Sequence, residues 1–170
     1  MKAKYCLDTS GFSSPLENMP EDIHILLWSH VIARVKDGLF AVTTEIYEEL
    51  EHLPGKIGAC IKESKDLLLF EIEDDEWDWV TYLVHVDQMR ETYAEVISEN
   101  HGNRANTVCL NDLSIIALAK TLGLPVVSSE KKLATGKDSK KRQKIPDICD
   151  KEGVTHMTFN EFLRAEGITN

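Results

Sequence analysis

The 170-residue chain is the size of one globular domain, and its 42% apolar and 28% charged residues are typical of a folded protein. The longest unbroken apolar run is five residues, at 115–119, whereas a membrane span needs about 20. The N-terminus lacks the apolar stretch of a secretory signal, and the four cysteines fit neither a zinc ribbon nor a disulfide scaffold. We therefore expect one cytoplasmic domain over residues 1–170, without a membrane segment.

The net charge of −10 argues against a protein that coats nucleic acid electrostatically, but this charge is unevenly distributed. Residues 131–144 hold seven of the nineteen basic residues and a single acid, so this segment carries +6 and the remaining chain −16. A solvated surface loop is the simplest interpretation of such a run. Contact with a nucleic-acid backbone is the alternative, through Lys140, Lys141 and Arg142.

In the N-terminal third, strands alternate with helices. Residues 4–7 predict a short strand, and residues 8–11 a strand-to-helix turn, because small hydroxyl residues and glycine favour tight turns and caps. Apolar residues recur at helical spacing over 23–35. A second strand is expected at 39–43, followed by a helix that begins at Thr43 or Thr44 and ends near Pro54.

The alternation continues toward the C-terminus. Residues 67–72 are a third strand candidate, although their apolar run equally fits a buried helix. Residues 75–99 predict a long helix with one apolar stripe, which we interpret as core, with dimerisation as the less simple alternative. A polar loop at 100–107 precedes a helix at 112–122 and a strand at 124–128.

The last predicted elements are a strand at 155–158 and a helix that begins at the capping box of residues 158–161. Strands that alternate with helices build parallel sheets covered on both faces. The predicted fold class is therefore α/β, a three-layer α/β/α sandwich with a central, mostly parallel sheet.

Acidic residues recur where the predicted strands end or the following helices begin: Asp8, Glu45, Glu49, Asp112 and Glu130. Ligands bind at the carboxyl edge of such sheets. Each acid also has a structural explanation, since an acidic residue at a helix start caps the helix and Glu130 can pair with a neighbouring lysine. Glu45 and Glu49 both lie in one predicted helix, and the sequence leaves open which of them faces the site.

Several acids gathered at one sheet edge would repel one another. Two unit charges about 5 Å apart cost on the order of 3 kcal/mol at an effective dielectric of 20. A divalent cation relieves this repulsion, and ligand sets made only of oxygen atoms favour Mg²⁺ or Mn²⁺. The hydroxyls of Thr9, Ser10 and Ser128 could hold water or substrate nearby. The residues alone thus indicate a metal-dependent phosphodiesterase.

Four segments resemble the acidic motifs of PIN-domain nucleases, in the order that this family has them: residues 5–10 (YCLDTS), 44–50 (TEIYEEL), 111–119 (NDLSIIALA) and 126–130 (VVSSE). Two further parts of the chain are similar to the DUF4411 branch of PIN-like proteins. One is the C-terminal run at 144–149 with the Gly153-Val154 pair, and the other is the stretch that holds Pro20, Trp28 and Gly38. The resemblance covers nearly the whole chain and is weakest at 56–106.

The resemblance implies a Mg²⁺- or Mn²⁺-dependent endoribonuclease of the VapC-like toxin kind, which is neutralised by a cognate antitoxin. It assigns the catalytic metal to Asp8, Glu49, Asp112 and Glu130, with Ser128 orienting the attacking water. Glu130 departs from the commoner aspartate, and Ser10 replaces a frequent asparagine.

The implied substrate is RNA, cut to leave a 5′-phosphate and a 3′-hydroxyl. Thr9, Ser10, Lys140, Lys141 and Arg142 are the expected substrate contacts. The alternative to an enzyme is a non-catalytic PIN-like module that acts through a protein partner, and homodimerisation is a further possibility in either case.

Overall fold

The computed structural model describes residues 2–103, 105, 107–133 and 142–168. Its sheet has four strands in the order β2-β1-β3-β4, and every neighbouring pair is parallel. The strands are β1 (Tyr5–Leu7), β2 (Phe40–Ala41), β3 (Val126–Val127) and β4 (His156–Met157). From β1 the chain moves outward to β2 on one side and later to β3 and β4 on the other. The strand order therefore reverses between β1 and β3, where α/β proteins form their sites.

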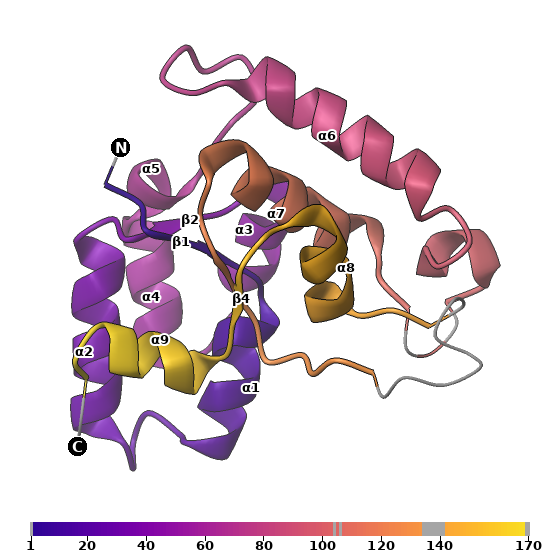
Figure 1. The fold of residues 1–170 in the computed structure, drawn as a ribbon. Coiled ribbons are helices and arrows are strands. Elements are labelled where there is room, and N and C mark those ends of the chain that lie inside the picture. The colour runs from indigo at the N-terminus through magenta and orange to yellow at the C-terminus, as the bar shows by residue number, and fades with distance from the viewer. Residues whose placement is uncertain (1, 104, 106, 134–141, 169–170) are drawn as a thin grey trace.

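Helices cover both faces of the sheet (Figure 1). They are α1 (Ser10–Asn18), α2 (Ile25–Lys36), α3 (Thr44–Leu50), α4 (Gly55–Glu63), α5 (Lys65–Leu68), α6 (Trp79–Thr92), α7 (Leu110–Leu122), α8 (Ile145–Glu152), α9 (Phe159–Ala165) and the 3₁₀ helix η1 (Ser98–His101). α7 packs against β1 and β3 with α3 and α8 beside it, and α6 lies along the outer side of α7. α1, α2, α4 and α9 occupy the other face. The predicted three-layer α/β fold is confirmed.

Aromatic rings join the helices of the second face to the sheet. Phe12 of α1 meets Trp28 of α2 and Phe40 of β2 edge-on, with ring centroids 6.1 and 5.2 Å apart. Phe159 of α9 stacks on Trp28 at 5.7 Å. These rings are almost fully buried, so they anchor three helices to one edge of the sheet.

Most predicted elements are confirmed with bounds that differ by a few residues; the strands are shorter than predicted, and α7 begins two residues earlier. The strands predicted at 4–7, 39–43, 124–128 and 155–158 are β1, β2, β3 and β4, and the helices predicted at 23–35, from 44, from 112 and from 158 are α2, α3, α7 and α9. The capping box at Thr158 and Glu161 is present. A helix, α1, follows the predicted turn at 8–11 and continues through Pro15 to Asn18.

The strand predicted at 67–72 is wrong. The first part of this run ends the short helix α5, which is the alternative that the apolar pattern left open. After it Leu69 forms an isolated bridge with Val42, the residue that follows β2, because Val42 N donates to Leu68 O at 2.9 Å and Phe70 N donates to Val42 O at 3.0 Å.

The helix predicted at 75–99 is also shorter, because Asp78 caps it and it ends at Thr92. Beyond Thr92 the chain turns, and Ile97 forms a bridge with Val108. The apolar stripe nevertheless packs into the core, because the side chains of Tyr82 and Met89 are buried in the hydrophobic core. The stripe is therefore core, as predicted.

Two helices, α4 and α8, were not foreseen. Among the described residues, no helix has the length and apolar character needed to cross a membrane.

Candidate metal and active site

Asp8 directly follows β1, at the point where the strand order reverses. Its backbone N–H donates to Val127 O of β3 at 3.0 Å, which fixes the residue between the two central strands. Its carboxylate Oδ2 accepts hydrogen bonds from Ser10 N at 3.0 Å and Ser10 Oγ at 2.5 Å. The side chain is buried, so Asp8 is held in place by the first turn of α1.

Ser10 also ties this turn to the loop after β3. Ser129 N donates to Ser10 Oγ at 3.1 Å, and Ser129 Oγ donates to Ser10 O at 2.7 Å. The approach is close because residue 11 is glycine: a Cβ there would lie 2.7 Å from Val127 O. Ser10, which is predicted to contact substrate, uses its hydroxyl to order Asp8 and the β3 loop. Ser129 was not predicted to have a role beyond its place in the fourth motif.

Glu49 reaches the same region from α3. Its Oε2 accepts a hydrogen bond from Thr9 Oγ1 at 2.5 Å, and its Oε1 accepts one from Asn111 Nδ2 at 2.8 Å. Glu49 thus connects the turn after β1 with the start of α7. Glu45, one helical turn earlier, is close enough to Tyr82 for its charge to add to the raised pKa of that residue, for which burial is the larger cause. Of the two candidates, Glu49 is the one that contacts the residues around Asp8 and Asp112.

Asp112 is the third residue of α7, and its carboxylate takes part in a capping box. Cys109 N donates to Asp112 Oδ2 at 2.7 Å, and Asp112 N donates to Cys109 Sγ at 3.4 Å. The structural role that the sequence allowed for Asp112 is therefore present. The cap uses Oδ2, and the same side chain is close enough to Asp8 and Glu130 to be affected by their charges.

Glu130 follows β3, and both of its oxygens have partners. Oε1 pairs with Lys144 Nζ at 2.9 Å, and Oε2 accepts a hydrogen bond from Ile145 N at 2.8 Å. Ile145 begins α8, so Glu130 holds the start of that helix at the sheet edge. The lysine that pairs with Glu130 is thus not one of its sequence neighbours, and the pairing was not predicted.

Ser128 is fully buried beneath this edge. Its Oγ lies 2.7 Å from His156 Nε2 and accepts a hydrogen bond from Glu130 N at 3.3 Å. His156 was not predicted, although the parallel register of β3 and β4, which sets it opposite Val126, brings it close. Burial lowers the pKa of His156, which favours the neutral ring. Ser128 therefore supports the backbone that carries Glu130.

The four acids influence one another electrostatically. Burial raises the pKa of Asp8 to about 6, the hydrogen bonds from Ser10 oppose this rise, and the charges of Glu130 and Glu49 add to it. Burial raises the pKa of Asp112 to about 7, with further contributions from Asp8 and Glu130. In the described part of the chain, neither Asp8 nor Asp112 forms an ion pair with a basic side chain.

The negative charges of these four carboxylates would attract a cation, but the side chains are not arranged as a complete coordination shell. Within the described ranges, no group of three or more His, Cys, Asp or Glu side chains lies in a metal-binding arrangement. Asp8 and Asp112 have the donor chemistry and the uncompensated charge that Mg²⁺ or Mn²⁺ would satisfy. Glu49 and Glu130 are engaged by neighbours, so they would have to exchange or share these partners.

The basic segment contributes less free charge than its composition indicates. Of its four described cations, Lys144 pairs with Glu130 and Lys132 with Asp150, whereas Lys131 and Arg142 are exposed. Lys140 and Lys141 lie outside the described residues.

Comparison with known proteins gives one family match. Residues 5–170 match the family described as "Domain of unknown function (DUF4411)". The comparison with curated protein sequences gives no match.

Proposed function

The chain belongs to the DUF4411 family, and we propose that it is a metal-dependent endoribonuclease. The observation that carries the proposal is the pair of carboxyl groups of Asp8, which is buried, and Asp112, which is half-buried, at the reversal point of a parallel sheet. Both groups have a raised pKa, and the negative charge of Glu130 contributes to both rises. Like-charged groups with raised pKa values at a sheet edge are typical of functional sites.

Asp8 and Asp112 would hold the metal ion, with Glu49 and Glu130 completing its surroundings. Ser10 and Ser129 keep the Asp8 carboxylate in one position, and Thr9 and Asn111 do the same for Glu49. When bound, Mg²⁺ or Mn²⁺ activates water and stabilises the charge that develops on the phosphate. The protein's own contribution is to fix the carboxylates before substrate arrives.

RNA as the substrate, and a VapC-like toxin role with a cognate antitoxin, rest on the resemblance of the four acidic segments to PIN-domain nucleases. Arg142, which is exposed, would contact the RNA backbone together with Lys140 and Lys141. Such contacts supply most of the sequence-independent affinity of nucleic-acid-binding proteins.

The proposal is tested by incubating the purified chain with single-stranded RNA labelled at one end, in Mg²⁺, in Mn²⁺ and in EDTA. We expect endonucleolytic cleavage with either metal and none in EDTA. Asp112→Asn should lose activity but keep its fold, because the amide oxygen can still accept the hydrogen bond from Cys109 N. A variant that cuts RNA as fast as the parent would show that Asp112 is not part of the site.

The second candidate is a non-catalytic binding module. The engaged oxygens of Glu130, and the lack of a closely gathered metal-ligand group among the described residues, favour it. This candidate predicts neither RNA cleavage nor metal-dependent stabilisation.

A further inference from the structure

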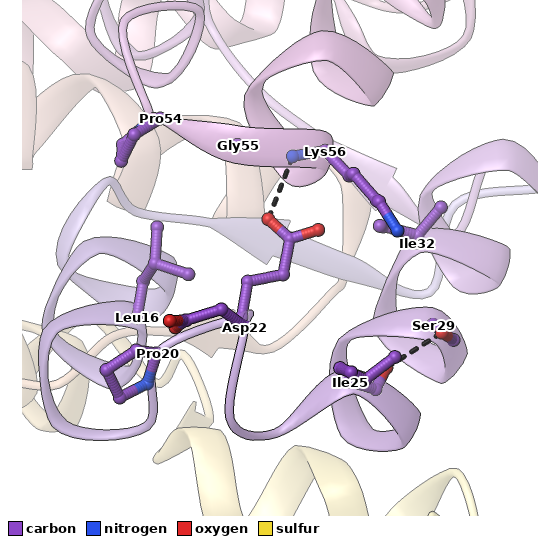
Figure 2. A pocket seen from close by; sticks show the side chains of 10 residues that line it. Leu16, Pro20, Asp22, Ile25, Ser29, Ile32, Pro54, Gly55 and Lys56 are labelled. Atoms are coloured by element: carbon purple, nitrogen blue, oxygen red, sulfur yellow. Dashed lines mark hydrogen bonds between the residues drawn. The ribbon is translucent and has the colours of Figure 1, made fainter.

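A pocket of about 590 Å³ lies between the end of α1, the start of α2 and the start of α4. It shares no residue with the carboxylate site described above. Figure 2 shows its apolar walls, which Leu16, Pro20, Ile25, Ile32 and Pro54 provide. Its volume is in the range of pockets that bind small molecules, about 300–1,000 Å³.

One carboxylate is built into this apolar pocket. Glu21 Oε2 accepts hydrogen bonds in the first turn of α4, from Ile57 N at 3.5 Å and from Lys56 N at 2.8 Å. Figure 2 shows the bond from Lys56 N. Gly55 allows this close approach: its φ is +77°, and a Cβ there would lie 2.3 Å from Glu21 Oε2. The backbone of α4 therefore fixes the position of the carboxylate.

The other oxygen of the same carboxylate has no partner. Glu21 Oε1 is buried and accepts no hydrogen bond. None of the ion pairs among the described residues includes Glu21, although Lys56 also lines the pocket. A buried carboxylate oxygen without a donor is unfavourable, and a bound cation would supply that donor.

The surroundings select the charge and shape of a ligand. Asp22, also in the pocket lining, adds a second acid, so phosphates and other anions would be repelled. Ile25 is 57% exposed, and its sequence neighbours Ile23 and Leu26 are exposed as well. An apolar body with a single positive charge at one end matches this combination.

We propose that the pocket binds a small organic cation, an alkylamine or alkylguanidine. Its head group donates a hydrogen bond to Glu21 Oε1, and its alkyl chain packs against Leu16, Ile25 and Ile32. This site is independent of the proposed ribonuclease activity, because none of its residues belongs to the carboxylate site.

The test compares ligands of equal length and different charge: n-hexylamine, n-hexylguanidine, n-hexanol and hexanoate. Binding is measured by calorimetry and by NMR of the isoleucine methyl groups. We expect either cation to bind at least ~10-fold more tightly than hexanol, as a charged hydrogen bond in a desolvated site allows, and hexanoate not to bind. The shifted methyl signals should be those of Ile25 and Ile32.

Glu21→Gln removes the charge but keeps an oxygen that can accept from Lys56 N, and its amide occupies the place of the unpartnered oxygen. The variant should melt no lower than the parent and bind hexylamine no better than hexanol. Glu17→Gln, at an exposed position outside the pocket lining, is the matched control and should keep the preference for the cations. Ile25→Ala removes an apolar wall at an exposed position, and should weaken all ligands alike.

Equal affinity of the parent for hexylamine and hexanol would overturn the role of Glu21. An absence of binding by both cations would overturn the site. Binding of an arginine- or lysine-containing peptide without binding of the free cations would assign the pocket to a protein partner and contradict the small-molecule proposal.

Discussion

Asp8 and Asp112 each combine a local structural role with a charge that the protein does not compensate. Ser10 orders the carboxylate of Asp8, and Cys109 engages that of Asp112 in a helix cap. Hydrogen bonds of this kind lower the pKa of a carboxyl group, yet burial dominates and both values are raised. These two groups therefore reduce the stability of the metal-free protein when they ionise.

The pKa of Asp8 gives a pH-dependent prediction. Because the value in the folded state, about 6, exceeds the value of 3.8 in the unfolded chain, the folded state binds more protons between these values. Stability is thus lost as the pH rises through this window. Without metal, Asp8→Asn should melt close to the parent at pH 4 and above it at pH 8. The difference corresponds to on the order of 3 kcal/mol for a rise of about two pKa units.

The measurement is calorimetric melting of both proteins in EDTA from pH 4 to pH 8. Taking the difference between them cancels the contribution of His156, whose pKa is lowered and which therefore acts in the opposite direction. Asp87→Asn, an exposed position on α6, should track the parent at every pH. A constant melting difference between Asp8→Asn and the parent would contradict the raised pKa.

Glu49 and Glu48 offer a matched pair on α3. Both are exposed, but Glu49 contacts Thr9 and Asn111 across the site. We expect Glu49→Gln to lower RNA cleavage at least ~10-fold, because it removes one charge next to the metal, whereas Glu48→Gln leaves it unchanged. Initial cleavage rates at saturating Mg²⁺ would measure this. Equal rates for the two variants would remove Glu49 from the mechanism.

At the scale of elements, the position of α1 against β3 depends on Gly11. A Cβ at this position would meet Val127 O at 2.7 Å and Leu7 Cδ1 at 2.9 Å. Gly11→Ala should therefore destabilise the fold by about 1–3 kcal/mol through overpacking, and loosen the Ser10–Ser129 contacts. Urea unfolding of this variant is compared with that of Glu17→Ala, an exposed change on the same helix. Equal midpoints would contradict the close approach.

Helix α8 depends on Glu130 in a similar way. Glu130→Gln weakens the pairing with Lys144 and the hydrogen bond from Ile145 N. We expect faster hydrogen exchange at the Ile145 amide and a stability loss of about 1 kcal/mol. Cleavage should fall less than in Asp112→Asn, because Glu130 already shares its oxygens with these partners. Unchanged exchange at Ile145 would mean that Glu130 does not hold the helix.

Local signals predicted the regular elements better than the irregular ones. Thr158 and Glu161 carry a capping box, and Gly123 adopts the left-handed cap conformation, so the limits of α9 and α7 were accessible. α8 was missed because it starts directly after the basic run, although Pro146 in its first turn is a helix-start signal. The end of α6 at Thr92 could not be seen, because the apolar stripe continues through Tyr93 while the backbone turns.

At the scale of the whole molecule, the parallel sheet brings together acids that are more than 100 positions apart in the sequence. The alternation of strands and helices predicted a parallel sheet of this type. The strand order explains why these acids influence one another: Asp8, Glu49, Asp112 and Glu130. Their partners could not be predicted: the pairing of Glu130 with Lys144 and the contact of Ser128 with His156 depend on the placement of α8 and β4.

The fold also shows where the charges behind the net charge of −10 lie. Part of the acidic excess lies at the sheet edge, and part of the basic segment is paired with acids there or on α8. We therefore expect RNA to bind weakly without metal, because the carboxylates at the sheet edge repel its phosphates. Filter binding in EDTA and with Ca²⁺ would measure this; equal affinities would mean that the carboxylates do not repel the substrate.

We propose that the carboxylates of Asp8 and Asp112 hold a divalent cation at this edge of the sheet. Melting at pH 7.5 of the parent and of Asp112→Asn, each in EDTA and in millimolar Mn²⁺, tests it most directly. We expect the variant to melt higher in EDTA, because it lacks a destabilising charge, and Mn²⁺ to raise the melting temperature of the parent alone. No Mn²⁺ shift in the parent, or an equal shift in both proteins, would contradict the claim.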